Sequence, residues 1–154
     1  MPNSTAPLQI GDRAPAIRAG GVDLAKLRGK RVVLFFFPKS DTPGCTKEAC
    51  GFRDASKKFA KANAEIIGIS PEKGDPQQKF AAKYSLPFAF APDPDHAVAE
   101  AYGVWKEKSM YGKKYMGIER STFVIGEDGK IEKIFPKVKP EGHAEQVLEA
   151  LAEG

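Results

Sequence analysis

The chain has 154 residues, of which 42% are hydrophobic and 29% charged, a balance typical of a globular protein and not of a disordered one. Its 24 basic and 20 acidic side chains leave a net charge of +4, and the lysines are scattered along the chain, which argues against a dedicated nucleic-acid surface. The longest apolar run, Val32 to Phe37, falls far short of the roughly 18 residues that a membrane-spanning helix needs.

This length suits one compact domain, and we expect residues 1–154 to form it because no linker, repeat or low-complexity segment divides the chain. No basic cluster followed by an apolar stretch occurs between Met1 and Gly21, so we expect no secretory signal and a cytoplasmic protein without a membrane partner. No long apolar edge or extra segment is evident either, which favours a monomer.

The first predicted element is a strand from Lys30 to Phe37, whose Val and Phe residues form the continuous apolar run of a buried strand. A short polar loop follows. The next predicted element is a helix from Pro43 to about Ala62, with Cys50, Phe52 and Phe59 among its less polar positions.

The rest of the chain continues this alternation. The predicted elements are a strand at 65–70, a helix at 75–84, a short strand at 88–91, a helix through 102 that Asp95 caps, strands at 121–125 and 130–135 around an Asp128-Gly129 turn, and an amphipathic helix at 141–152. The basic and aromatic stretch from Trp105 to Tyr115 is interpreted as a solvated loop or hairpin, and base stacking on it is the less favoured alternative. This order predicts an α/β fold with a central mixed β-sheet flanked by helices on both faces. The thioredoxin-like fold has these parts in this order, although the order alone does not exclude other sheets.

The cysteine and histidine content argues against a structural metal site. Two cysteines, Cys45 and Cys50, are too few for the disulfide framework of a small secreted domain. The two histidines, His96 and His143, lie far from each other and from the cysteines in the sequence, so zinc binding is not favoured. Each histidine is expected at the surface or at a helix end. The acidic Asp93-Pro94-Asp95 segment is assigned to turn and cap chemistry instead of metal binding.

The segment that leads into the first helix carries the chemistry. After the buried strand ends at Pro38, Thr42 and Pro43 fit the N-cap and the first position of a helix. Cys45 then lies in the first turn, where unpaired N–H groups and the helix dipole favour a thiolate over a thiol. The alternative, a buried and inert cysteine, fits a polar loop-to-helix turn poorly.

Pro38, Thr42 and Cys45 match the Pro-x-x-x-Thr-x-x-Cys signature of the peroxiredoxins. The surrounding sequence resembles the bacterioferritin comigratory protein, or peroxiredoxin Q, subfamily. The segments that carry this resemblance include Glu48, Cys50, Phe52-Arg53-Asp54, Gly11-Asp12-Arg13-Ala14-Pro15, Tyr102-Gly103-Val104 and Arg120-Ser121-Thr122-Phe123-Val124. Ser40 stands where relatives often carry an acid and Ile17 where they often carry an aromatic residue, but neither change touches the motif.

The resemblance implies roles for four residues of this segment. Cys45 corresponds to the peroxidatic cysteine, which becomes a sulfenic acid, and Cys50 fits the resolving cysteine found five residues later in part of the subfamily. Thr42 corresponds to the hydroxyl that orients thiolate and peroxide. Pro38 corresponds to the residue that shields the sulfur from bulk water.

The resemblance also implies a supporting pair, in which Arg120 reaches the site from another strand and Glu48 positions it. From the residues alone, Glu48 is equally explained as a favourable charge in the first helical turn, and Arg120 as the partner of any surface acid. Arg53 is expected to be a solvated helix residue outside the site.

The implied activity is the reduction of hydrogen peroxide and organic hydroperoxides by an atypical 2-Cys peroxidase, with thioredoxin or a similar dithiol as reductant. Complete ionisation of a free thiol of pKa about 8.5 gains only about thirtyfold at pH 7, or about 2 kcal/mol. Donors such as Arg120, Thr42 and the N–H groups of the first turn must therefore stabilise the leaving oxygen. No haem, flavin or metal cofactor is then required.

Two other functions stay open. A general thiol–disulfide oxidoreductase on the same fold usually carries Cys-x-x-Cys, which the four-residue gap here does not match, and insulin reduction beside peroxide reduction separates the two enzymes. A non-catalytic binding or holdase module has an unreactive Cys45, which a rapid stoichiometric loss of thiols with peroxide excludes.

Overall fold

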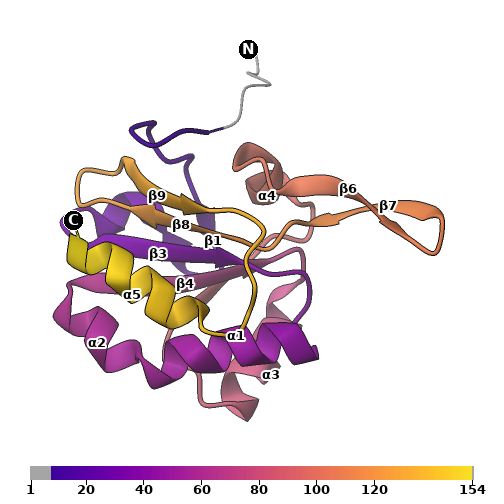
Figure 1. Cartoon of the computed structure of the whole chain (residues 1–154), viewed down its shortest axis with the longest axis horizontal. Coiled ribbons are helices and arrows are strands. Elements are labelled where there is room, and N and C mark those ends of the chain that lie inside the picture. The colour runs from indigo at the N-terminus through magenta and orange to yellow at the C-terminus, as the bar shows by residue number, and fades with distance from the viewer. Residues whose placement is uncertain (1–7, 154) are drawn as a thin grey trace.

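A five-stranded mixed sheet lies at the centre of the computed structural model, which describes residues 8–153 (Figure 1). The strand order is β5-β4-β3-β8-β9, with bounds Ala89–Pro92, Ala64–Ser70, Arg31–Phe36, Ser121–Ile125 and Ile131–Phe135. β3, β4 and β5 are parallel, whereas β8 is antiparallel to β3 and β9 to β8. The expectation about a secretory signal between Met1 and Gly21 rests partly on residues 1–7, which lie outside the described range.

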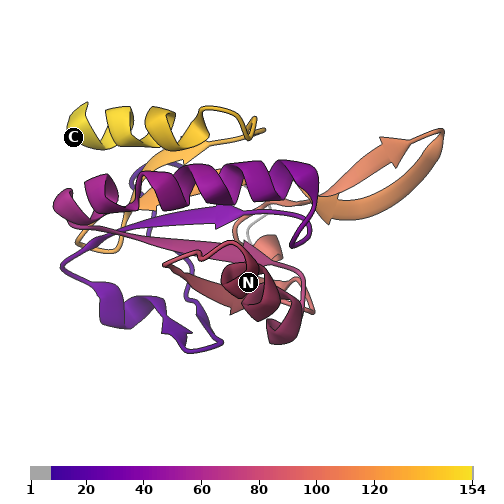
Figure 2. The same ribbon diagram turned by 90° about the horizontal axis from the view of Figure 1, so that it is seen from below.

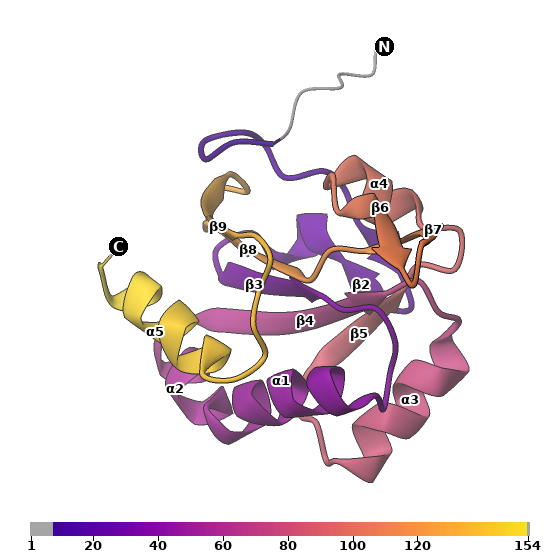
Figure 3. The same ribbon diagram turned by 45° about the vertical axis from the view of Figure 1, so that its right-hand side comes forward.

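Helices cover both faces of this sheet, as predicted. Their bounds are α1 Pro43–Asp54, α2 Ser56–Lys61, α3 Gly74–Lys83, α4 Ala97–Ala101 and α5 His143–Glu153, with a short 3₁₀ helix, η1, at Leu24–Leu27. α1, α2, α3 and α5 contribute to the apolar cluster on one face, and η1 and α4 contribute to the cluster on the other. Figure 2 shows α1 and α5 on the same side of the sheet, and Figure 3 shows α4 on the side opposite α1.

The central strand β3 is buried on both faces, which explains why its sequence is apolar from Val32 to Phe36. Val33 and Phe35 enter the cluster under α1, while Leu34 and Phe36 enter the cluster under α4. Successive side chains of a strand point to opposite faces, so a strand buried on both sides shows no alternation. Gly68 in β4 makes room for the aromatic rings beside it, because a Cβ there would lie 2.9 Å from the Phe35 ring.

A second, separate hairpin projects from the body of the molecule (Figures 1 and 2). It consists of β6, Trp105–Met110, and β7, Lys113–Ile118, which pair antiparallel. The interpretation of this basic stretch as a loop or hairpin is therefore confirmed as a hairpin. A further two-stranded sheet, β1 Arg18–Ala19 and β2 Val22–Asp23, precedes η1 and was not expected. Among residues 8–153, no helix is long and apolar enough to cross a membrane.

Two helix boundaries differ from the prediction. The helix expected from Pro43 to Ala62 is two helices, because Ala55 leaves helical geometry at φ −98° and ψ 5°. The predicted cap Asp95 bonds only the Ala97 N–H, at 3.3 Å, and the N-cap position of α4 belongs to His96.

The main acceptor at the start of α4 is Asp93. Its two carboxylate oxygens accept from the Val98 and Ala99 N–H groups at 3.0 and 2.9 Å, so they satisfy donors that have no helical partner. The assignment of this acidic segment to turn and cap chemistry agrees with these bonds, although the residue that caps most effectively is not the one expected.

Candidate active site

Cys45 lies in the first turn of α1, directly after the loop that follows β3. Thr42 is the N-cap residue, with extended backbone at φ −95° and ψ 156°, and Pro43 is the first helical residue. The Thr46 N–H donates to the Thr42 carbonyl at 2.8 Å and closes the turn. The sulfur is therefore carried at the positive end of the helix dipole, beside N–H groups that lack helical acceptors.

The Cys45 side chain is nonetheless buried, with 1% of the residue exposed. It belongs to the apolar cluster that also contains Phe37 and Ala49. The expectation that a cysteine in this turn stays out of the apolar interior is wrong, because α1 packs its first turn against the end of β3. Bulk water therefore has little access to the sulfur.

Thr42 and Pro38 border the turn that bears the thiol. The Thr42 hydroxyl donates to the Lys39 carbonyl at 2.8 Å and makes no side-chain cap of α1. The residue still occupies the N-cap position, and with its proton engaged by Lys39 its oxygen keeps free lone pairs. Pro38 is half-buried, two residues beyond the end of β3.

Arg120 and Glu48 are brought together across the fold. Arg120, just before β8, donates from Nη1 to Glu48 Oε1 at 2.7 Å, although 72 residues separate them in the sequence. The guanidinium also lies over the first turn of α1, because a Cβ at Gly44 would be 3.2 Å from Nη2. Gly44 thus provides the space in which Arg120 approaches Cys45.

The electrostatics of this group follow from burial and from the negative charges that face Arg120. Burial lowers the pKa of Arg120, but the Cys45 sulfur and the Glu48 carboxylate outweigh it and raise the pKa above its ordinary value. Burial raises the pKa of Glu48 to about 7, against the opposing effect of its hydrogen bond to Arg120. Its second oxygen, Oε2, is buried without a hydrogen-bond partner. Arg120 is thus shared between a carboxylate and a potential thiolate.

Cys50 lies five residues further along α1, half-buried, and both cysteines are free thiols. Arg53 is close to it: the hydrogen bond to Asp54 is the main cause that raises the pKa of Arg53, and the charge of Cys50 adds to it. Arg53 also donates from Nη1 to the Tyr84 carbonyl at 2.9 Å. Arg53 is a partly exposed helix residue, in line with the expectation, and it also ties α1 to Tyr84, the residue that ends α3.

Lys108 is a cation near the site that sequence reasoning missed. It lies in β6 and is half-buried between exposed neighbours. Burial and the positive charge of Arg120 lower the pKa of Lys108, while the negative charges of Glu119 and Cys45 act in the opposite direction. The only signal in the sequence was that this basic hairpin returns directly into Arg120.

The two histidines lie apart from the sulfur chemistry. His96 is at a helix end, as expected, where its ring stacks on Trp105 at a centroid distance of 4.1 Å. His143 is also at a helix end, as expected, because it begins α5, and only 2% of it is exposed. Its Nε2 lies 2.7 Å from the Thr122 hydroxyl and its Nδ1 2.9 Å from Gln146 Oε1. These polar partners explain how the ring is accommodated in the interior.

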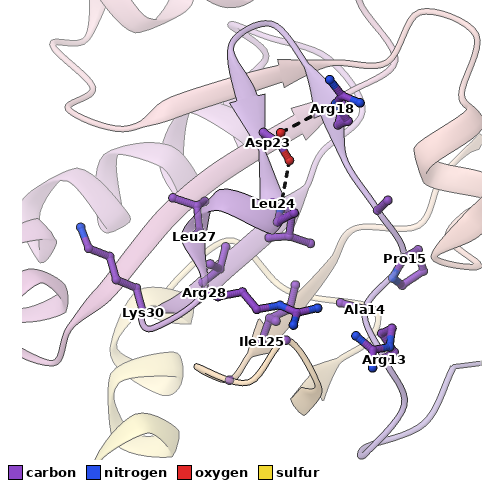
Figure 4. Close-up of a pocket in the computed structure, with 15 residues that line it drawn as sticks. Arg13, Ala14, Pro15, Arg18, Asp23, Leu24, Leu27, Arg28, Lys30 and Ile125 are labelled. Carbon is purple, nitrogen blue, oxygen red and sulfur yellow. Dashed lines mark hydrogen bonds and ion pairs between the residues drawn. The ribbon is translucent and has the colours of Figure 1, made fainter.

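A cavity of about 360 Å³ occurs on the face of the sheet that is covered by η1 (Figure 4). Its lining includes Val32 and Ile125 and the cationic side chains of Arg13 and Arg28. None of the residues around Cys45 lines it. The candidate active site is therefore the turn around Cys45 and not this cavity.

The comparisons with a family model and with curated relatives indicate the same family. The model of the AhpC/TSA family matches residues 8–134. The chain is 46% identical over 146 residues to a putative peroxiredoxin Bcp of Coxiella burnetii, which covers 92% of this chain and 97% of the relative. It is also 46% identical over 149 residues to peroxiredoxin Bcp of Bacillus subtilis, covering 94% and 95% of the two chains.

Solved structures agree with these relatives. A structure of Xanthomonas campestris peroxiredoxin Q superposes with a TM-score of 0.82 at 41% identity, covering 86% of this chain and 84% of that one. A cysteine-to-serine variant of Xylella fastidiosa PrxQ gives a TM-score of 0.88 at 34% identity, with coverages of 96% and 98%. The predicted thioredoxin-like fold is thereby confirmed. The chain belongs to the AhpC/TSA family and, within it, to the Bcp or peroxiredoxin Q peroxiredoxins, a membership that supports thiol-dependent peroxidase activity.

Proposed function

We propose that the chain reduces peroxides with the thiolate of Cys45 as nucleophile. The observation that carries the proposal is the guanidinium of Arg120, which faces the Cys45 sulfur while a 2.7 Å bond to buried Glu48 fixes its position. A cation held against a buried thiol stabilises the thiolate. The N-terminus of α1 acts in the same direction.

In the first step, the thiolate attacks one peroxide oxygen as the O–O bond breaks. The sulfur gains that oxygen and becomes a sulfenic acid, while the leaving oxygen takes up a proton and departs as water or an alcohol. Arg120 and the N–H groups of the first turn stabilise the negative charge that develops on the leaving oxygen. The Thr42 oxygen accepts a hydrogen bond from the peroxide O–H and orients it, and Pro38 limits the access of bulk water.

In the second step, Cys50 attacks the sulfur of the Cys45 sulfenic acid. A Cys45–Cys50 disulfide forms and water leaves, so no external thiol is needed to resolve the intermediate. A dithiol reductant, thioredoxin or a similar protein, then supplies two electrons and two protons to restore both thiols. Every residue in this scheme comes from one chain, which is compatible with a working monomer.

The substrates we propose are hydrogen peroxide and organic hydroperoxides. A related protein, the bacterioferritin comigratory protein of Xanthomonas campestris, is known for alkyl peroxide reduction activity. The same chemistry at Cys45 requires only an O–O bond and a leaving oxygen that can be protonated.

The test is intact-protein mass spectrometry after one equivalent of peroxide, with and without thioredoxin. Wild type is expected to lose two hydrogens as the disulfide forms and to regain them with thioredoxin. Cys50→Ser is expected to complete one turnover and accumulate a sulfenic acid that dimedone traps. Cys45→Ser is expected to be inactive, and normal turnover of this variant refutes the assignment. Insulin reduction by wild type, without peroxide reduction, indicates a general oxidoreductase instead.

A further inference from the structure

The β6–β7 hairpin exposes an unusual share of the large apolar side chains. Five such side chains are exposed among the described residues, and four of them are on this hairpin: Met110 at 56%, Tyr111 at 98%, Tyr115 at 44% and Met116 at 49%, the fifth being Ile10. Tyr111 and Gly112 form the tip, both with positive φ, as in the two-residue turns that close regular hairpins. Exposed apolar side chains gathered on one projecting element mark an interaction surface.

The strand register divides the hairpin into two faces. Residues that pair directly across two strands lie on the same face, and alternate residues of one strand share a face. One face, called here the lysine face, consists of Lys106, Lys108, Met110, Lys113, Tyr115 and Gly117. The other, called the opposite face, consists of Trp105, Glu107, Ser109, Lys114, Met116 and Ile118. The lysine face thus combines three cations and two large apolar side chains. Glu119, directly after β7, pairs with Lys106 at 3.7 Å, whereas Lys108 and Lys113 form no ion pair among residues 8–153.

The lysine face leads to the active site. The side chains of Lys108 and Tyr115 both lie beside Gly117, because a Cβ there would be 3.4 Å from Lys108 Cδ and from Tyr115 Cε2. Lys108 is the residue of this face whose charge interacts with Arg120 and Cys45. Figures 1 and 2 show the hairpin projecting from the same end of the molecule at which α1 begins.

A partner that reacts at the cysteines must cover this end of the molecule. A protein dithiol has to bring one sulfur into bonding contact with α1, so its surface around that sulfur meets whatever projects beside the helix. Transient redox encounters are small, below about 1,200 Å² of total buried surface, so the docking site of such a partner need not extend over the whole protein. Since Lys108 and Lys113 on the lysine face form no ion pair within the described part of the chain, complementarity calls for an acidic partner with an apolar patch.

We propose that the lysine face of the β6–β7 hairpin is the docking surface for the protein dithiol that reduces the oxidised enzyme. The proposal rests on the function proposed above, in which a Cys45–Cys50 disulfide forms. Lys108 and Lys113 attract the acidic surface of the reductant, and Met110 and Tyr115 contact its apolar patch. Lys113 has no ion-pair partner among residues 8–153, which leaves its charge available to a second protein.

The docked reductant transfers electrons in two exchanges. Its thiolate attacks one sulfur of the Cys45–Cys50 disulfide, that S–S bond breaks as a mixed disulfide forms, and the other cysteine leaves as a thiolate. The second reductant thiol then attacks the mixed disulfide. The reductant departs with its own disulfide, and its two thiol protons pass to Cys45 and Cys50.

The experiment compares two matched double variants of the full chain. Met110→Ser with Lys113→Glu alters the lysine face, and Met116→Ser with Lys114→Glu makes the same chemical changes on the opposite face. Three rate constants are measured for each protein: oxidation by hydrogen peroxide, reduction by thioredoxin, and reduction by dithiothreitol, which has no protein surface. Circular dichroism establishes that both variants are folded.

The lysine-face variant is expected to lose about tenfold or more in its rate of reduction by thioredoxin, and the opposite-face variant less than about twofold. Peroxide oxidation and dithiothreitol reduction are expected to stay at wild-type rates in both. Added salt is expected to slow thioredoxin reduction of wild type more than that of the lysine-face variant.

Several outcomes overturn the inference while leaving the peroxidase function intact. The first is an equal rate constant for reduction by thioredoxin in the two double variants. The second is that dithiothreitol reduces oxidised wild type but thioredoxin does not. Co-sedimentation with anionic phosphatidylglycerol vesicles that only the lysine-face variant loses, with its thioredoxin rate unchanged, assigns the face to a membrane surface and also overturns it. If wild type does not oxidise with peroxide at all, the proposed function fails instead.

Discussion

Arg120 faces two groups of α1, the Glu48 carboxyl, to which it donates a hydrogen bond, and the Cys45 sulfur. Glu48 has a fully buried side chain, and Arg120 is only 17% exposed in its side chain, so the pair sits largely out of water. Removing one partner of such a pair typically costs about 3–5 kcal/mol, because the other charge stays buried and uncompensated. We infer that Glu48 positions the guanidinium, and that Gly44 leaves the room for it to reach the sulfur.

The first prediction separates the two effects of Arg120 on Cys45. Arg120→Met is expected to raise the pKa of Cys45 and also to slow its oxidation by peroxide, by roughly a hundredfold at equal thiolate fraction, because a donor to the leaving oxygen is lost. Arg120→Lys keeps the charge but lacks the planar guanidinium, whose separate N–H groups face Glu48 and the Cys45 sulfur at the same time. An intermediate loss of rate is therefore expected. Thiolate absorbance gives the pKa and rapid-mixing kinetics give the rate. A corrected rate equal to wild type in Arg120→Met contradicts the second effect.

The positions of residues close to Cys45 in the sequence were predictable, whereas contacts with residues far from it in the sequence were not. The places of Thr42, Pro43 and Cys45 at the helix start follow from capping preferences, but the direction of the Thr42 hydroxyl depends on the Lys39 carbonyl, which a loop conformation sets. The Arg120–Glu48 contact spans 72 residues, and only the family resemblance indicated it. Spacing along the chain carries no information about which distant strand end meets a given helix.

At the scale of elements, α1 carries both cysteines in one uninterrupted helix from Pro43 to Asp54. Positions five apart in an α-helix are separated by about 140° around the axis and by about 7.5 Å along it, so their Cα atoms are about 8.7 Å apart. A disulfide rarely tolerates more than about 7 Å. A bond between Cys45 and Cys50 therefore requires the helix to open.

The second prediction is that oxidation unwinds the first turns of α1. Hydrogen exchange of the amides from Thr46 to Phe52 is expected to be faster in the disulfide form than in the reduced form. Gly51 lies within this segment, and local opening of a helix end is among the least costly motions of a fold. Amides of α5 provide the internal control and are expected to change little. Equal protection from Thr46 to Phe52 in both states, with the bond verified by mass, contradicts the prediction.

The long elements were predicted to within a few residues because each buries a regular apolar pattern. β3 and β4 are examples, since a strand buried on both faces gives an apolar run that no loop shows. The paired strands β1 and β2 were missed because a strand of two residues is too short to show an alternation of apolar and polar side chains. The break at Ala55 was missed because alanine favours a helix, so the sequence gives no sign that the helix is interrupted there.

For the whole molecule, two buried titratable groups, Glu48 and His143, make contributions to stability that change with pH in opposite directions. Burial raises the pKa of Glu48 from its ordinary value of 4.5 to about 7, so the folded state binds that proton more tightly than the unfolded state does. The stabilisation that Glu48 contributes to the folded state is fully present below its pKa in the unfolded chain, and it is lost as pH rises through about 7. Burial lowers the pKa of His143, assisted by the charge of Arg120 and opposed by the hydrogen bond to Gln146. Its contribution is present above the unfolded value of about 6.5 and is lost as pH falls.

The third prediction isolates His143 from that background. The difference in free energy of unfolding between wild type and His143→Gln is expected to be largest above pH 7 and to shrink as pH falls below about 6.5, by up to about 1.4 kcal/mol per pH unit. The reason is that protonation in the folded state places a charge in an apolar pocket between Phe52 and Phe135 and disturbs the bond to Thr122. Urea unfolding of the reduced protein at a series of pH values measures this difference.

Glu48→Gln provides a control of opposite sign for the same measurement. The stability of wild type relative to Glu48→Gln is expected to fall as pH rises from about 4.5 through 7, since the folded carboxyl loses a proton that burial made favourable. Unfolding measurements on wild type and the two variants over one pH range therefore distinguish the effect of the buried base, His143, from that of the buried acid, Glu48. If the difference between wild type and His143→Gln stays constant from pH 5 to 8 while that of Glu48→Gln changes, the neutral state of His143 contributes nothing to the pH dependence. In that case the ring at the start of α5 acts through packing alone.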